Sequence, residues 1–178
     1  MALKSTVYKA ELQISDMDRH YYHGHSLTLA LHPSETEERM MIRLLAFALN
    51  ASDTLAFGKG LSTEEDAALW QKDLTGHVTL WIDVGLPDEK RIKKASHRAD
   101  QVHIYCYGER TAPNWWEHNQ RKTRTFPNVR VDYVNPQTCA ELVTLCDRTM
   151  QLHCNIQDGE TSLGNNASSV SIEMENWL

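Results

Sequence analysis

The chain has 178 residues, of which 41% are hydrophobic and 24% charged, so it is long enough to bury the core of one folded domain. This composition excludes a disordered tail and a peptide hormone. No run approaches the roughly 18 apolar residues that a membrane helix needs, and the first residues lack the pattern of a secretory signal. We therefore expect a single domain over residues 1–178, located in the cytoplasm and without a membrane partner.

The formal net charge of −6 argues, taken as an average, against a nucleic-acid partner, because phosphate backbones are bound by basic surfaces. The charge is nevertheless uneven along the chain. Residues 90–130 hold ten Lys or Arg against three acids, giving +7, whereas the rest of the chain holds eight bases and twenty-one acids, giving −13. Either the fold gathers these bases on one surface that binds nucleic acid, or they are solvated charges spread over several helices.

The cysteines are too sparse to cross-link a chain of this length, and no two of them form a Cys-x-x-Cys pair. We therefore expect buried thiols at Cys106, Cys139, Cys146 and Cys154.

In the first half of the chain, alternating apolar and polar residues predict two strands joined as a hairpin. A helix with an acidic start follows, and Ser34 could cap it. The elements expected in this half are strands over residues 6–15, 26–31 and 54–57, a helix over 35–50, and one or two helical turns within 64–70.

In the second half, strands and helices alternate. The run from His77 to Val84 is the most strand-like, because it is β-branched and aromatic, with a carboxylate, Asp83, near its end. Strands that flank helices, with hairpins at both ends of the chain, predict a compact mixed α/β sheet flanked by helices. The elements expected here are strands over 77–84, 101–107 and 129–134, helices over 88–100, 114–123 and 136–150, and pairing of 152–156 with 170–174.

Three acids occur where a divalent cation could bind. Glu38 lies in the first turns of the first helix, Asp73 just before the most strand-like run, and Asp83 near its end. Hard cations such as Mg²⁺ or Mn²⁺ take oxygen ligands, usually one or two carboxylates together with water and phosphate oxygens. Such an ion makes a bound water a better nucleophile and neutralises phosphate charge. The alternative is that Asp73 caps a turn and Glu38 stabilises a helix start.

A run of basic residues follows the third of these acids. On the predicted helix over 88–100, Arg91, Lys94 and Arg98 flank the buried stripe, whereas Lys90 points away. A lysine that leans toward Asp83 could hold a phosphate or a hydroxide. This arrangement favours a phosphate-handling site at that end of the sheet.

Aromatic and basic residues also occur together on the next helix. Trp115 and Trp116, followed by Arg121, Lys122 and Arg124, combine stacking surfaces with phosphate-binding charge, as single-strand binders do. Adjacent residues on a helix diverge by about 100°, so we expect at most one of the two tryptophans to face solvent.

Several segments resemble the YaeQ family of bacterial proteins, across essentially the whole chain. The resemblance rests on residues 32–41, 80–95, 114–116, 147–150 and 156–159. That family is understood as a compact variant of the PD-(D/E)XK nuclease fold. The active site of that fold joins a helix carboxylate, an aspartate at the start of a strand, and an acid-x-lysine on the following strand. The resemblance implies Glu38, Asp73 and Asp83 as the acids, holding Mg²⁺ or Mn²⁺.

The sequence departs from the family pattern at the motif lysine, because the chain reads Asp83-Val84-Gly85. Some superfamily members take the lysine from the next helix, where Lys94 is the candidate and Lys90 the reserve. Two functions follow. The first is a metal-dependent phosphodiesterase acting on nucleic acid, and the second is a non-catalytic nucleic-acid- or protein-binding protein on a degenerate nuclease scaffold. The sequence leaves the oligomeric state open.

Overall fold

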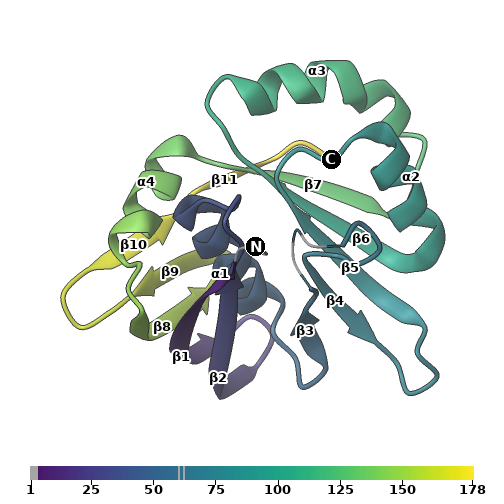
Figure 1. Ribbon diagram of the computed structural model, residues 1–178. Helices are drawn as coiled ribbons and strands as arrows, with labels where there is room; N and C mark the ends of the chain where they lie inside the picture. Colours follow the sequence, from purple (N-terminus) through teal and green to yellow (C-terminus); the bar gives the residue numbers. More distant parts are fainter. Residues whose placement is uncertain (1–3, 60, 62) are drawn as a thin grey trace.

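The computed structural model describes residues 4–59, 61 and 63–178, and these form two mixed β-sheets and four helices (Figure 1). The first sheet has the order β10-β9-β8-β1-β2, with β1 (Thr6–Asp16), β2 (Tyr21–Leu31), β8 (Thr149–Gln157), β9 (Glu160–Gly164) and β10 (Ser169–Ile172). The second has the order β11-β7-β6-β5-β4-β3, with β3 (Leu55–Phe57), β4 (Leu69–Lys72), β5 (Val78–Val84), β6 (Ala99–Cys106), β7 (Val129–Val134) and β11 (Met174–Asn176). The helices are α1 (Glu37–Asn50), α2 (Glu89–Arg98), α3 (Thr111–Thr123) and α4 (Pro136–Thr144). The predicted mixed α/β class is confirmed, but the strands form two sheets and not the single sheet that was expected.

The first sheet is built around β1. Ala10, Leu12 and Ile14 are buried, and the residues between them are exposed, so one face of the strand is apolar. β1 pairs with β2 in antiparallel register, which confirms the predicted hairpin, and with β8 in parallel register. Its two neighbours thus come from opposite ends of the chain.

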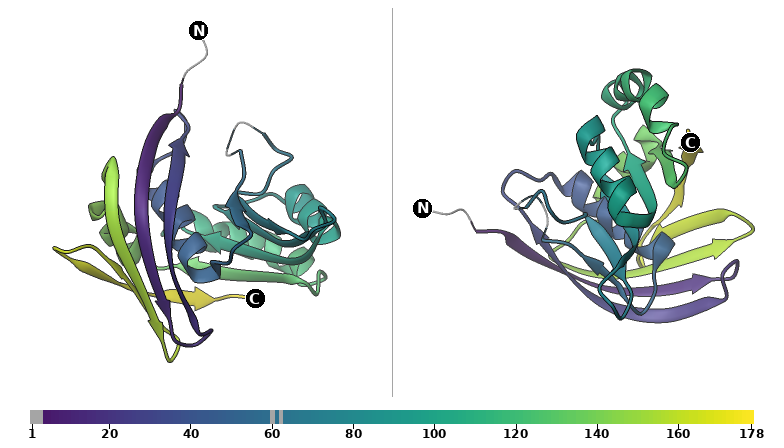
Figure 2. Two further views of the ribbon diagram at one scale, coloured as in Figure 1. Left: turned by 90° about the horizontal axis from the view of Figure 1, so that it is seen from below. Right: turned by 90° about the vertical axis from the view of Figure 1, so that its right-hand side faces the viewer.

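Helix α1 is the centre of the core. Every residue from Met40 to Ala48 is buried, as expected for a helix that has packing partners all round. Figure 2 shows the first sheet curving around α1, with α2 and α3 beyond the second sheet. The helix is capped by Thr36, whose Oγ1 accepts a hydrogen bond from Arg39 N at 3.1 Å. The predicted cap, Ser34, instead contacts the His32 ring.

The second sheet has two different faces. β5, β6 and β7 are parallel, and α2 and α3 cross between them over one face. Side chains alternate along these strands, so Trp81 and Ile104 pack toward α2 and α3, whereas Ile82 and Tyr105 belong to the core around α1. Each face can therefore carry its own site.

Three predicted elements are wrong. Residues 64–70 were expected to be helical, but Leu69 begins β4 and pairs with Ile82 of β5. The helix expected over 136–150 ends at Thr144, because the chain turns there and continues into β8. Residues 152–156 were expected to pair with residues 170–174, but they pair with β1 and β9. Residues 170–172 also pair with β9, and Met174 pairs with β7.

None of the helices in the described ranges has the length and the apolar character that a membrane crossing requires.

Candidate functional site

A buried ion pair joins β5 to α2. The Asp83 residue is 4% exposed, and its two carboxylate oxygens accept hydrogen bonds from Arg91 Nε at 2.7 Å and Nη2 at 2.8 Å. Asp88 sets the start of α2, because its side chain accepts a hydrogen bond from Arg91 N at 2.8 Å. That start fixes the helical phase that turns Arg91 back over the sheet. The paired charge explains how a carboxylate stands in an otherwise apolar strand.

The same guanidinium also fixes the loop before β4. Arg91 Nη1 donates to the carbonyl oxygen of Glu64 at 2.9 Å, and Nη2 donates to that of Asp66 at 2.8 Å. Beside these contacts lies a cavity of about 400 Å³, lined by Asp83, Arg91, Glu64, Asp66 and Arg39, among others. Hydrogen bonding to Asp83 raises the pKa of Arg91, so the guanidinium keeps its charge. The cavity therefore combines acidic side chains with fixed positive charge.

Asp73 does not take part in this cavity. It lies in the turn between β4 and β5, where Oδ1 accepts hydrogen bonds from Thr75 N at 2.8 Å and from His77 N at 3.1 Å. Hydrogen bonding to Thr75 lowers the pKa of Asp73. Asp83 is five residues beyond the first residue of β5, which is about 17 Å along an extended strand. The predicted convergence of Asp73 and Asp83 is therefore wrong, and the turn-cap alternative holds.

Glu38 stands at the start of α1, in the first turn of the helix, as the sequence predicted. Burial is the main cause of the raised pKa of Tyr107, and the negative charge of Glu38 raises it further. Within the described parts of the chain, no three His, Cys, Asp or Glu residues gather closely enough to hold a metal ion. With Asp83 bound to Arg91 and Asp73 at the far end of β5, the predicted acids do not fit an Mg²⁺ or Mn²⁺ centre.

The two candidate lysines do not reach Asp83. Lys94 Nζ lies 2.7 Å from Glu65 Oε1, and Lys90 is exposed. Lys94 lies almost one helical turn beyond Arg91, so it meets the loop acid instead of the strand acid. Arg91 thus occupies the place that the sequence assigned to Lys94. Arg98 is held in a similar way, because its Nη1 donates to the Glu65 carbonyl oxygen at 3.0 Å.

The tryptophan pair of α3 is largely part of the core. Trp116 is buried and stacks on Trp177 with ring centroids 5.9 Å apart. Trp115 is half-buried, and its Nε1 donates to the Pro87 carbonyl oxygen at 2.7 Å. Of the basic residues on this helix, Arg121 and Lys122 are exposed, and the exposed Arg124 at its end lies over the Trp116 ring. The expectation that at most one tryptophan faces solvent agrees with this packing.

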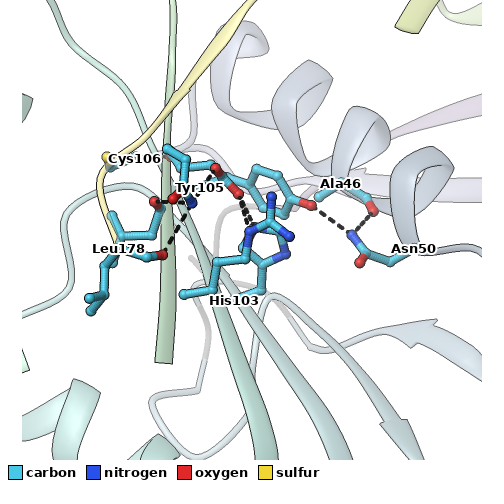
Figure 3. Close-up of polar contacts among 10 residues, drawn as sticks. Ala46, Asn50, His103, Tyr105, Cys106 and Leu178 are labelled. Carbon is cyan, nitrogen blue, oxygen red and sulfur yellow. Dashed lines mark hydrogen bonds and ion pairs between the residues drawn. The ribbon is translucent and has the colours of Figure 1, made fainter. Parts of the chain in front are cut away.

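Two groups of polar residues were missed from the sequence. Asp66 shares the cavity with Asp83 because β4 runs antiparallel to β5, a pairing that the helical prediction for 64–70 concealed. His103 and Asp132 form a second group on the opposite face of the sheet (Figure 3). A signal was available for the second group, since His103 and Asp132 are polar residues within apolar strands and so need partners.

Comparison with known proteins gives consistent matches over nearly the whole chain. The model of a family described as "YaeQ protein" matches residues 1–174. The uncharacterized protein YaeQ of Salmonella typhi is 43% identical and that of Escherichia coli (strain K12) 42% identical, each over 99% of this chain and 98% of the relative. The crystal structure of YaeQ protein from Xanthomonas axonopodis pv. citri has a TM-score of 0.93 at 46% identity, covering 97% of this chain and 98% of that one. The structure from Pseudomonas syringae has a TM-score of 0.93 at 33% identity, covering 98% and 96%.

Proposed function

The chain belongs to the YaeQ family, and from that premise we propose that it binds nucleic acid through α2 and α3, on a scaffold related to the PD-(D/E)XK nucleases. The relation to that scaffold is supported by the order of elements. A helix with Glu38 is followed by β4, which Asp66 precedes, and by β5, which carries Asp83. Binding rather than cleavage is favoured because Arg91 neutralises Asp83, the acid on which a nuclease metal site would depend.

The observation that carries the proposal is a set of exposed cations on two helices that pack together, α2 and α3. We call them the helix-layer cations, and they are Lys90, Lys93, Arg121 and Lys122. Within the described chain, their side chains make no hydrogen bond or ion pair, unlike those of Arg91, Lys94 and Arg98. Unpaired surface bases are free to replace the counterions of a phosphate backbone.

The charge distribution supports the same surface. The bases are concentrated in residues 90–130, and α2 and α3 lie side by side on the outer face of the second sheet (Figure 1). Arg130 is the exception, because it contacts Asp132 on the opposite face. A segregated basic face reconciles nucleic-acid binding with a net charge of −6.

Fluorescence anisotropy tests the proposal with labelled single-stranded DNA, double-stranded DNA and RNA of equal length, between about 50 and 200 mM salt. We expect the affinity to fall steeply with salt for at least one of the three nucleic acids. The double variants Lys90→Gln/Lys93→Gln and Arg121→Gln/Lys122→Gln should each weaken binding. Each should also lower the salt slope by about 0.7–0.9 for every phosphate that the variant no longer neutralises.

The matched control is Lys4→Gln/Lys9→Gln, which removes the same charge from exposed residues on the first sheet and the segment before it. This variant should bind like the unmodified protein. Equal losses of affinity in the control and the test variants, or no binding at the lower salt concentration, would overturn the proposal. Cleavage of the same oligonucleotides with Mn²⁺, abolished by Asp83→Asn, would instead favour the phosphodiesterase, with Asp66 in place of Asp73.

A further inference from the structure

A second cavity, of about 530 Å³, lies across the second sheet from α2 and α3. Its floor consists of side chains of β5, β6 and β7 on the face toward α1. The end of α1 and Met174 of β11 form its walls. Leu49, Leu80 and Met174 give it an apolar part, and His103 and Arg130 give it a polar part. It is separate from the proposed nucleic-acid surface.

The polar part is organised around the buried carboxylate of Asp132, which contacts the ring of His103, labelled in Figure 3. Asp132 is 2% exposed, and its Oδ2 lies 2.5 Å from His103 Nε2 and accepts a hydrogen bond from Arg130 Nε at 2.9 Å. Its Oδ1 accepts a hydrogen bond from Asn176 Nδ2 at 3.0 Å. The parallel register places His103 opposite Arg130 and Tyr105 opposite Asp132, so these contacts follow directly from the strand pairing.

The protonation states follow from these contacts. Burial lowers the pKa of His103, against the effect of Asp132, so the ring is neutral at pH 7. Burial alone would raise the pKa of Asp132, but the hydrogen bonds from His103 and Asn176 outweigh it and the pKa is lowered. An ionised carboxylate can only accept hydrogen bonds, so Nε2 of His103 carries the hydrogen and Nδ1 carries a lone pair.

The remaining atoms of this group are available to a ligand. Nδ1 of His103 and the terminal nitrogens of Arg130 make no hydrogen bond with the described residues. If Nδ1 of His103 were fully buried, it would be a buried nitrogen without a hydrogen-bond partner. Among the described residues, Trp81 Nε1 is the one fully buried side-chain nitrogen or oxygen of that kind, so Nδ1 of His103 is in contact with solvent. The Arg130 side chain is 63% exposed. Asp132 thus holds two side chains whose outward-facing atoms are unpaired.

We propose that this cavity binds a small molecule that carries a phosphate group. The terminal nitrogens of Arg130 hold two phosphate oxygens, and a third oxygen shares one proton with His103 Nδ1. A guanidinium fork matches two oxygens of a phosphate or a carboxylate, but the third position requires a group with more than two oxygens. The apolar walls cover the organic part of the ligand, and the volume lies within the usual range for small-molecule sites.

NMR titration of the His103 ring tests this proposal with three probes, which are inorganic phosphate, adenosine 5′-monophosphate and adenosine. A phosphate beside Nδ1 favours the charged imidazolium, so both phosphate probes should raise the pKa of His103 and adenosine should not. Tighter binding of the monophosphate than of inorganic phosphate identifies a phosphorylated organic ligand. Equal or tighter binding of inorganic phosphate identifies free phosphate as the ligand.

Substitutions separate this site from general anion binding. Arg130→Gln should weaken phosphate binding by about 10- to 100-fold, as expected for the loss of a charged hydrogen-bond donor. Arg110→Gln, at an exposed residue before α3, is the matched control and should leave binding unchanged. The proposal is overturned if phosphate leaves the His103 resonances unmoved, if acetate moves them as strongly as phosphate, or if both arginine variants lose affinity equally. The titration of the unmodified protein decides the question even if a variant misfolds.

Discussion

Arg91 donates two hydrogen bonds to the carboxylate of Asp83, and its Nη1 and Nη2 also donate to the carbonyl oxygens of Glu64 and Asp66. One guanidinium therefore joins β5, α2 and the loop before β4. Its position over the Trp81 ring, 5.5 Å from the ring centroid, adds a cation–π contact. The ion pair therefore has a structural role, whether or not the cavity beside it binds a ligand.

Replacing Arg91 should destabilise the protein strongly. Arg91→Leu leaves the Asp83 carboxylate buried without a partner, so we expect the free energy of unfolding in urea to fall by about 3 kcal/mol. The exposed neighbour Lys90 provides a control, because Lys90→Leu should change the free energy of unfolding by no more than about 0.5 kcal/mol. Similar losses of stability in the two variants would show that the ion pair contributes little.

The glycine that follows β5 is required by the backbone. Gly85 has φ of +116°, which side-chain-bearing residues rarely adopt, although a Cβ there would meet nothing within 4 Å. Gly85→Lys should therefore cost about 1–3 kcal/mol through backbone strain. Gly85→Ala should cost nearly the same, since no clash is involved. Urea denaturation of both variants measures this, and a Gly85→Lys protein of unchanged stability would show that the turn adapts.

Elements with a strong local pattern could be predicted from the sequence, and those defined by distant pairing could not. The run His77–Val84 is β-branched throughout much of its length, and β5 is found there. β4 has four residues and is a strand because it pairs with β5, so no periodicity marked it. Beyond Thr144 the apolar spacing continues to Met150 at helical intervals, although Met150 faces the core from β8.

The site shows the same division. The buried position of Asp83 and the turn-cap alternative for Asp73 followed from local sequence. The partner of Asp83 depended on the helical phase of α2, and a shift of one turn separates Arg91 from Lys94. The grouping of His103 with Asp132 required the order of parallel strands, which local patterns do not specify.

The stability should decrease as the pH falls below about 6.5. The folded-state pKa of His103 lies below its ordinary value of 6.5, so the unfolded chain takes up a proton at a higher pH than the folded protein does. The lowered pKa of Asp132 adds a further loss below its ordinary value of 3.8. Burial also lowers the pKa of His25, which adds a loss of the same sign. Urea midpoints measured between about pH 5 and 8 should fall toward acid, and His103→Gln should reduce this dependence.

The control for this dependence is His118→Gln, since His118 is exposed on α3. Its pH profile should follow that of the unmodified protein. An undiminished slope in His103→Gln would show that His103 does not contribute to the pH dependence.

Thiol reactivity should single out one cysteine. Burial raises the pKa of Cys106, Cys139 and Cys154 to about 12 and that of Cys146 to about 11. Cys146 is also the one that is not fully buried, so a disulfide reagent should modify it first and the others only on unfolding. Mass spectrometry of the partly labelled protein reads this order. Labelling of Cys146→Ser at an unchanged initial rate would contradict it.

The pairing of β1 with β8 has a consequence for folding on the ribosome. Lys9 lies opposite Thr149 in parallel register, so the central pair of the first sheet forms across most of the chain length. Contacts between such distant residues slow folding, because the intervening chain must be ordered before they form. Helix α1 follows the N-terminal hairpin directly and can cover its apolar face, but one edge of β1 stays unpaired until residues 149–157 have been synthesised. An unpaired edge of this kind can pair with another chain, so the first sheet is open to self-association until β8 occupies it.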